Sequence, residues 1–185
     1  MKKTKHHITT LALILALSAI VSTTQAQVTD NANLRLKLYQ LAFIDLEPDN
    51  GIISFSLAQP TNPGLPAESG NNNSKWINYS CCVKNSKPDR YITVEINNGS
   101  IPPGLELQLS ASSYSGTGAG LLGSPSGTVV LTAIAQTLIS GIRGSYTGNG
   151  ANNGHQLTYN LVITDYSLLD YDQSSTIQVV YTIVD

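Results

Sequence analysis

Leu105-Glu106-Leu107-Gln108-Leu109-Ser110 decides the fold, because its leucines alternate strictly with polar residues. Alternation with a period of two predicts a β-strand with one buried and one solvated face. Similar patterns recur along the chain, at 33–38, 52–58, 75–83, 90–96, 128–133, 136–142, 157–163 and 176–184. Strands at this spacing predict an all-β fold, a single antiparallel β-sandwich of about eight strands, with a closed barrel as the alternative.

Segments rich in Gly, Pro, Ser and Asn separate these patterns and predict turns or loops. Two short stretches, 134–140 and 167–170, are the only helical candidates. Three long loops are expected, at 59–74, 112–127 and 144–156. Loops on a rigid sandwich often carry recognition, so these three are candidate binding surfaces.

The first 26 residues have the pattern of a secretory signal peptide. Lys2, Lys3 and Lys5 precede an apolar run at 11–21, and Thr24-Gln25-Ala26 offers a cleavage site before Gln27. The run is too short to span a bilayer. We therefore expect residues 1–26 to be a signal peptide and residues 27–185 a single domain. Such a protein is exported, with no membrane span after cleavage.

The expected mature chain is mildly acidic, since 12 acidic and 7 basic residues give a net charge of −5. Between Glu106 and Asp165 the only formal charge is Arg143. A chain without a basic cluster is a poor candidate for binding nucleic acid or an anionic membrane surface. Hydroxyl and amide side chains on the outer faces of a sheet would keep such a chain soluble, or would pack against copies of itself or against sugar.

The two cysteines, Cys81 and Cys82, are neighbours and form a candidate redox pair. Adjacent Cα atoms lie about 3.8 Å apart, closer than an ordinary disulfide requires. Three states stay open: free thiols, a strained vicinal disulfide, or a bridge between chains. In a strand, one of the two side chains would face the interior and the other the solvent.

The sequence favours no catalytic site, and we expect a non-enzymatic protein without cofactor or metal. His155 is the only histidine after residue 26, and its place before a strand indicates a hydrogen-bonding surface residue. Asp45, Glu47 and Asp49 are spaced like a calcium loop, but the glycine comes one position late and Ser56 stands where a glutamate is needed. A second acidic group comprises Asp165, Asp170 and Asp172. Solvated loop carboxylates are the commoner explanation of both.

Trp76 is the single tryptophan and the candidate for stacking on a sugar ring. Core or edge packing is the competing explanation. If Trp76 or the long loops bind a ligand, the protein is a secreted module that recognises a glycan or a protein.

The final strand, Thr176 to Val184, and the leucine-alternating segment 31–46 resemble the ends of exported bacterial fimbrial subunits. The resemblance implies an immunoglobulin-like sandwich that is completed by a strand from the next subunit, with a periplasmic chaperone as an earlier partner. Leu34, Leu36 and Leu38 would be the side chains that enter the neighbour. The sequence departs from that family because the usual disulfide between distant strands is missing. Segment 31–46 is otherwise the first strand of its own domain.

Overall fold

The structure is a computed structural model that describes residues 30–68, 70–171 and 174–185. The expected signal peptide, residues 1–26, lies outside the described residues. The chain divides after Lys37 into two units. Of the first unit, residues 30–37 are described, and they are exposed and form no strand. Within the described residues, no helix is both long and apolar enough to cross a membrane.

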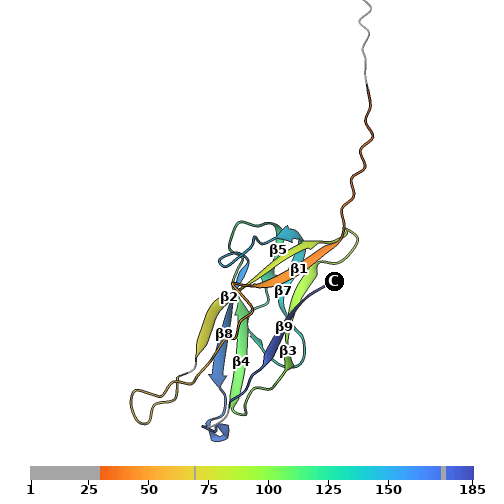
Figure 1. Ribbon diagram of the computed structural model, residues 1–185. Coiled ribbons are helices and arrows are strands. Elements are labelled where there is room, and N and C mark those ends of the chain that lie inside the picture. The colour runs from red at the N-terminus through yellow and green to blue at the C-terminus, as the bar shows by residue number, and fades with distance from the viewer. Residues whose placement is uncertain (1–29, 69, 172–173) are drawn as a thin grey trace, which may run out of the picture. The chain divides into compact units, whose positions relative to one another are not determined.

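The described residues of the second unit form nine strands and one short 3₁₀-helix, Tyr166–Leu168 (Figure 1). The strands are β1 (Leu41–Glu47), β2 (Asn71–Cys82), β3 (Arg90–Asn98), β4 (Leu105–Ala111), β5 (Ala119–Pro125), β6 (Val129–Val130), β7 (Gln136–Tyr146), β8 (His155–Ile163) and β9 (Gln178–Val184).

All strand pairs are antiparallel, and hydrogen bonds join them in the order β6-β4-β8-β2-β7-β3-β9. β1 pairs with β2, and β5 pairs with β7, beside this path. β2 changes partner along its length: residues 71–77 pair with β8, whereas Ser80 and Cys81 pair with β7. The all-β antiparallel prediction is therefore confirmed. The sandwich and its immunoglobulin-like form stay predictions, because one continuous sheet connects all nine strands.

One hydrophobic core collects the inward residues of the alternating strands. Leu107 and Leu109 of the opening stretch are buried, and their neighbours in the core come from β2, β3, β7 and β8. Fully buried members are Ile77, Ile92, Leu109, Leu138, Ile139, Ile142 and Leu157. Alternation thus placed the core face correctly, since successive side chains of a strand point to opposite faces.

Several element predictions were wrong. The expected loop 112–127 contains β5, the expected loop 59–74 ends where β2 begins at Asn71, and β7 continues through Tyr146. The helical candidate 134–140 lies mostly in β7. Segment 52–58 was expected to be a strand, but it forms only the isolated bridge between Ala58 and Glu68.

Glycine explains why β5 escaped the sequence pattern. A Cβ atom at Gly120 would lie 2.0 Å from the carbonyl oxygen of Gly144 on β7. Glycine therefore lets the two backbones approach closely, at a position where φ is also positive. The same residue type that usually indicates a loop is here required by strand pairing.

Candidate functional site

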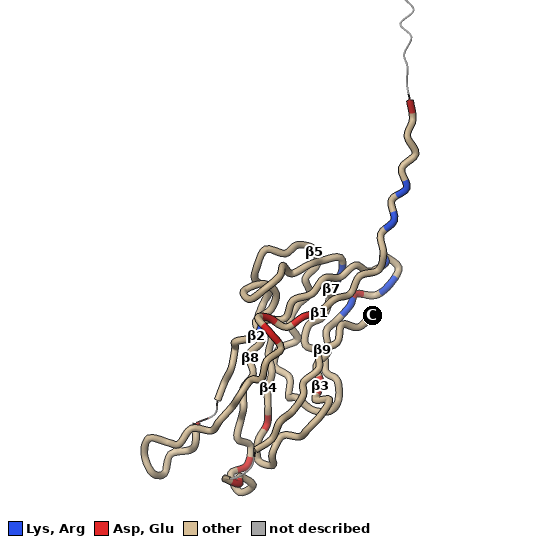
Figure 2. The backbone as a smooth tube through the Cα atoms, viewed as in Figure 1, with Lys and Arg blue, Asp and Glu red and all other residues tan. Residues whose placement is uncertain are grey.

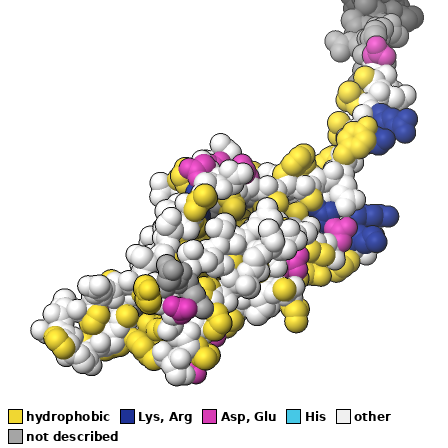
Figure 3. Space-filling model, turned by 60° about the horizontal axis from the view of Figure 1, so that its bottom comes forward, with side chains coloured by type: hydrophobic (Ala, Val, Ile, Leu, Met, Phe, Trp, Pro, Cys, Tyr) yellow, Lys and Arg dark blue, Asp and Glu magenta, His cyan; other side chains and the backbone are white. Residues whose placement is uncertain are grey.

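The three leucines predicted to enter a neighbouring subunit lie at the surface. Leu34, Leu36 and Leu38 are 87%, 90% and 83% exposed, and residues 30–40 lie outside any strand. Apolar and basic side chains both appear along this segment in Figure 3. Burying one such leucine would gain about 1.5–3 kcal/mol, so their exposure leaves a sizeable apolar surface unused.

The second part of segment 31–46 belongs to its own domain. Leu41–Glu47 forms β1 and pairs with β2 from Cys82 to Trp76. Ile44 and Leu46 pack against the core. The structure thus divides the predicted segment. Residues 41–46 belong to an intramolecular first strand, and residues 31–40 lie outside any strand.

Arg90 links the beginning of β1 to the end of β9. Its guanidinium forms an ion pair with Asp185 and donates a hydrogen bond to the carbonyl oxygen of Leu41 over 2.7 Å. Arg90 is only 2% exposed, whereas the rest of the sheet carries few charges (Figure 2). The buried cation is satisfied by these partners and fixes the point at which the exposed segment joins the domain.

The two cysteines are free thiols in different surroundings. Cys81 is buried beside Arg90, with Sγ 4.0 Å from a guanidinium nitrogen, and Cys82 is half-buried. Burial raises the pKa of the Cys81 thiol, and the nearby Arg90 only partly offsets this. Cys81 is therefore the inward-facing thiol, whereas Cys82 is half-buried rather than fully exposed to solvent. A bridge between chains stays a prediction.

The expectation of a surface position for His155 was wrong, because its side chain is fully buried. Nδ1 donates to the carbonyl oxygen of Ser112 over 2.8 Å, and Nε2 lies 3.0 Å from the hydroxyl of Tyr79. The ring also stacks on Tyr79, with centroids 5.9 Å apart. Burial lowers the pKa of His155. The strand β8 begins at this residue, so its side chain enters the core rather than the turn.

Trp76 is half-buried on β2, between Glu47 of β1 and Gln156 of β8. Directly opposed residues share a face, so all three point to the outer side of the sheet. Stacking on a sugar stays a prediction for Trp76.

Two of the carboxylates considered for calcium, Asp49 and Asp165, have other partners. Asp49 forms an ion pair with the buried Lys75, and this contact lowers the pKa of Asp49. Asp165 caps the 3₁₀-helix by accepting a hydrogen bond from Ser167, and its pKa is lowered for that reason. Among the residues that the structure describes, no three His, Cys, Asp or Glu side chains group together to hold a metal ion. Asp172 lies outside the described residues.

Compared with known proteins, the chain matches no family model, no curated protein and no solved structure.

Proposed function

We propose that the protein is an exported, non-enzymatic structural subunit of a bacterial cell-surface filament, assembled by strand exchange through residues 31–40. The observation that carries the proposal is the exposure of Leu34, Leu36 and Leu38. Their alternation would place all three on one face of an added strand, where they would fill pockets on a neighbour. The basic residues between them would face solvent.

Segment 52–57 supports the proposal because it could be the place where a subunit accepts the donated strand. Ile53, Phe55 and Leu57 alternate as half-buried residues, as in a strand, yet the segment forms no ladder among the described residues. A chain stretch with strand-like burial and unused backbone groups is a natural place for strand addition, since backbone hydrogen bonds provide much of the affinity.

The edge of β9 lies near the same part of the core. Phe55 contacts Tyr159, with ring centroids 6.4 Å apart, and the hydroxyl of Tyr159 is hydrogen-bonded to that of Tyr181 on β9. β9 ends the hydrogen-bonding order of the sheet. A donated strand would add to this edge, beside segment 52–57, and would bury its leucines over the core.

The signal-like residues 1–26 support export to the periplasm and cell surface. Partners in the proposal are further copies or other surface subunits. A periplasmic chaperone would cover the leucines or the accepting edge before assembly, because an exposed edge and an apolar strand together promote aggregation.

The test is the mass of the assembled protein, measured by light scattering after size exclusion. We expect chain 27–185 to form a ladder of oligomers and chain 41–185, which retains every strand, to stay monomeric. Replacing Leu34, Leu36 and Leu38 together by Ser should abolish the ladder without shortening the chain.

The matched control replaces Asn33 and Arg35 by Ser, on the opposite parity of the same segment. This variant should assemble like the unmodified chain. A monomeric chain 27–185 at high concentration, or a ladder unaffected by the leucine replacements, would refute the strand-exchange proposal.

A further inference from the structure

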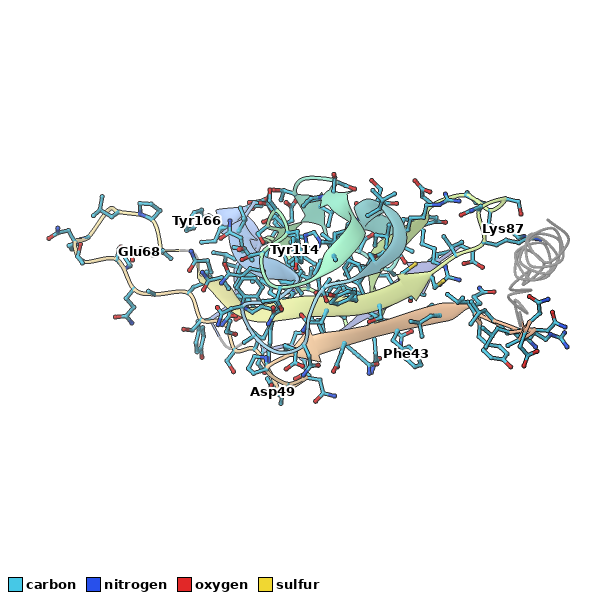
Figure 4. All side chains as sticks on the ribbon, turned by 90° about the horizontal axis from the view of Figure 1, so that it is seen from above. Phe43, Asp49, Glu68, Lys87, Tyr114 and Tyr166 are labelled. Carbon is cyan, nitrogen blue, oxygen red and sulfur yellow. The ribbon has the colours of Figure 1, made fainter. Side chains whose placement is uncertain are left out.

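An open groove of about 470 Å³ crosses the outer face of the sheet at β1, β2 and β7. Phe43 of β1 and Tyr146 of β7 are among its lining residues, and they are 68% and 52% exposed. Figure 4 shows Phe43 on β1, away from the crowded interior. Two large exposed aromatic side chains that line the same groove form an apolar surface of the kind that often marks a binding site.

Strand register places the two rings as opposite walls. Phe43 pairs with Ser80 of β2, and Ser80 pairs with Tyr146 of β7. Directly opposed residues point to the same face, so the three side chains form one row across three strands. Two strand spacings separate the aromatic residues by roughly 10 Å. Ser80, a small polar residue, forms the floor between them. The walls are held by the sheet rather than by loops.

The floor and rim supply uncharged or acceptor groups. Asn78 is 5% exposed, and its amide nitrogen donates to the carbonyl oxygen of Gly150 over 3.1 Å. Its Oδ1 has no hydrogen-bond partner among the described residues. That oxygen is itself buried from solvent, so the polar side chains that the groove offers to a ligand are those of Ser80, Asp45 and Asn149. Asp45 and Asn149 stand at the rim and can accept or donate further hydrogen bonds.

The charge of the groove limits the class of ligand. No Lys or Arg is among the described residues that line it, and Asp45 is its one carboxylate. A phosphate, sulfate or carboxylate ligand would meet repulsion and no cation. Aromatic walls around a floor of amide and hydroxyl groups instead suit a ring with apolar faces and hydroxyl edges.

We propose that this groove binds a neutral saccharide, with one sugar ring between Phe43 and Tyr146. The hydroxyl groups of the sugar donate to Asp45, and Ser80 contacts the edge of the ring. This site is separate from the proposed strand exchange, because it uses the outer face of β1 and none of residues 31–40. Trp76, the tryptophan singled out in the sequence, does not line the groove.

The experiment uses chain 27–185 on an array of neutral hexose and N-acetylhexosamine oligosaccharides, with sulfated and sialylated forms of the same sugars. The strongest neutral oligosaccharide is then titrated calorimetrically against each variant. We expect Phe43→Ala and Tyr146→Ala each to weaken binding about tenfold or more, and Phe43→Trp to restore it.

The matched control is Tyr171→Ala, which removes a fully exposed tyrosine away from the groove and should leave affinity unchanged. Thermal unfolding of every variant confirms that the fold is intact, as expected for exposed positions. The proposal would be overturned if no neutral oligosaccharide bound above the level of the Phe43→Ala/Tyr146→Ala double variant, or if the sulfated or sialylated forms were preferred. Saturation of the groove by a peptide of residues 30–40, with no saccharide bound, would overturn it as well.

Discussion

At the scale of single residues, Arg90 is a buried charged side chain that requires polar partners in the interior. It is fully charged and almost completely buried, and it is satisfied by Asp185 and by the carbonyl oxygen of Leu41. Replacing it leaves that carbonyl without its donor and removes the cation that pairs with Asp185, whose side chain is 57% exposed. We expect Arg90→Gln to lower the free energy of unfolding by about 2 kcal/mol or more, as measured by urea denaturation.

Arg143 provides the comparison: it also forms an ion pair, with Asp89, but it is only partly buried, and it donates further hydrogen bonds to the carbonyl oxygens of Asn85 and Lys87. Surface pairs contribute about 0–1 kcal/mol. Arg143→Gln should therefore lower the free energy of unfolding clearly less than Arg90→Gln does. Equal losses would contradict the structural role assigned to the buried arginine.

His155 predicts a dependence of stability on pH. Burial lowers its pKa below the ordinary value of 6.5, so the unfolded chain binds a proton at a higher pH than the folded chain does. The free energy of unfolding should then fall as the pH drops below about 6.5, because the unfolded state takes up the extra proton. Urea denaturation of chain 27–185 between pH 7.5 and 5 measures this slope.

The variant His155→Gln should be less stable at pH 7.5, because it loses the hydrogen bond to Ser112, and its stability should change less over the same pH range. His155 is the only histidine after residue 26, so it dominates titration in that range. An unchanged slope in the variant would show that another group is responsible.

At the scale of elements, the pairing of β5 with β7 depends on glycine. A Cβ at Gly120 would meet the backbone of Gly144 and Ser145, at a positive φ. We expect Gly120→Ala to lower the free energy of unfolding by about 3 kcal/mol, from the clash together with the strained φ. Gly127→Ala is the control, since its φ is also positive but no atom lies within 4 Å. It should cost only about 1 kcal/mol.

The strands also show how much of the secondary structure could be predicted from the sequence pattern. Strands whose leucines, valines and isoleucines alternate, such as β3, β4 and β8, were predicted close to their observed bounds. β5 was missed because its glycines were taken to indicate a loop, whereas they allow the backbone of β5 to lie close to that of β7. Segment 52–58 was predicted to be a strand. In the structure its alternate residues are half-buried, as in a strand, but the segment forms no ladder of hydrogen bonds with a described neighbouring strand. The alternation of apolar and polar residues indicates which face of a segment is buried. It does not indicate whether another strand lies alongside to form backbone hydrogen bonds.

At the scale of the whole molecule, some residues of the candidate sites could be singled out from the sequence and others could not. The half-buried strand predicted at 33–38 was wrong, because Leu34, Leu36 and Leu38 are exposed and no described strand begins before Leu41. Phe43, Ser80 and Tyr146 could not be connected, since they come from distant parts of the chain and meet only through strand register. His155 was misplaced because a strand begins at that residue, after an Asn- and Gly-rich turn.

The central claim is that residues 31–40 of one copy form a strand on the next. A labelled peptide of residues 30–40, titrated into chain 41–185 and followed by fluorescence anisotropy, measures this directly. We expect saturable binding that is lost when Leu34, Leu36 and Leu38 of the peptide are replaced by Ser. Absence of binding, or equal binding of the replaced peptide, would contradict it.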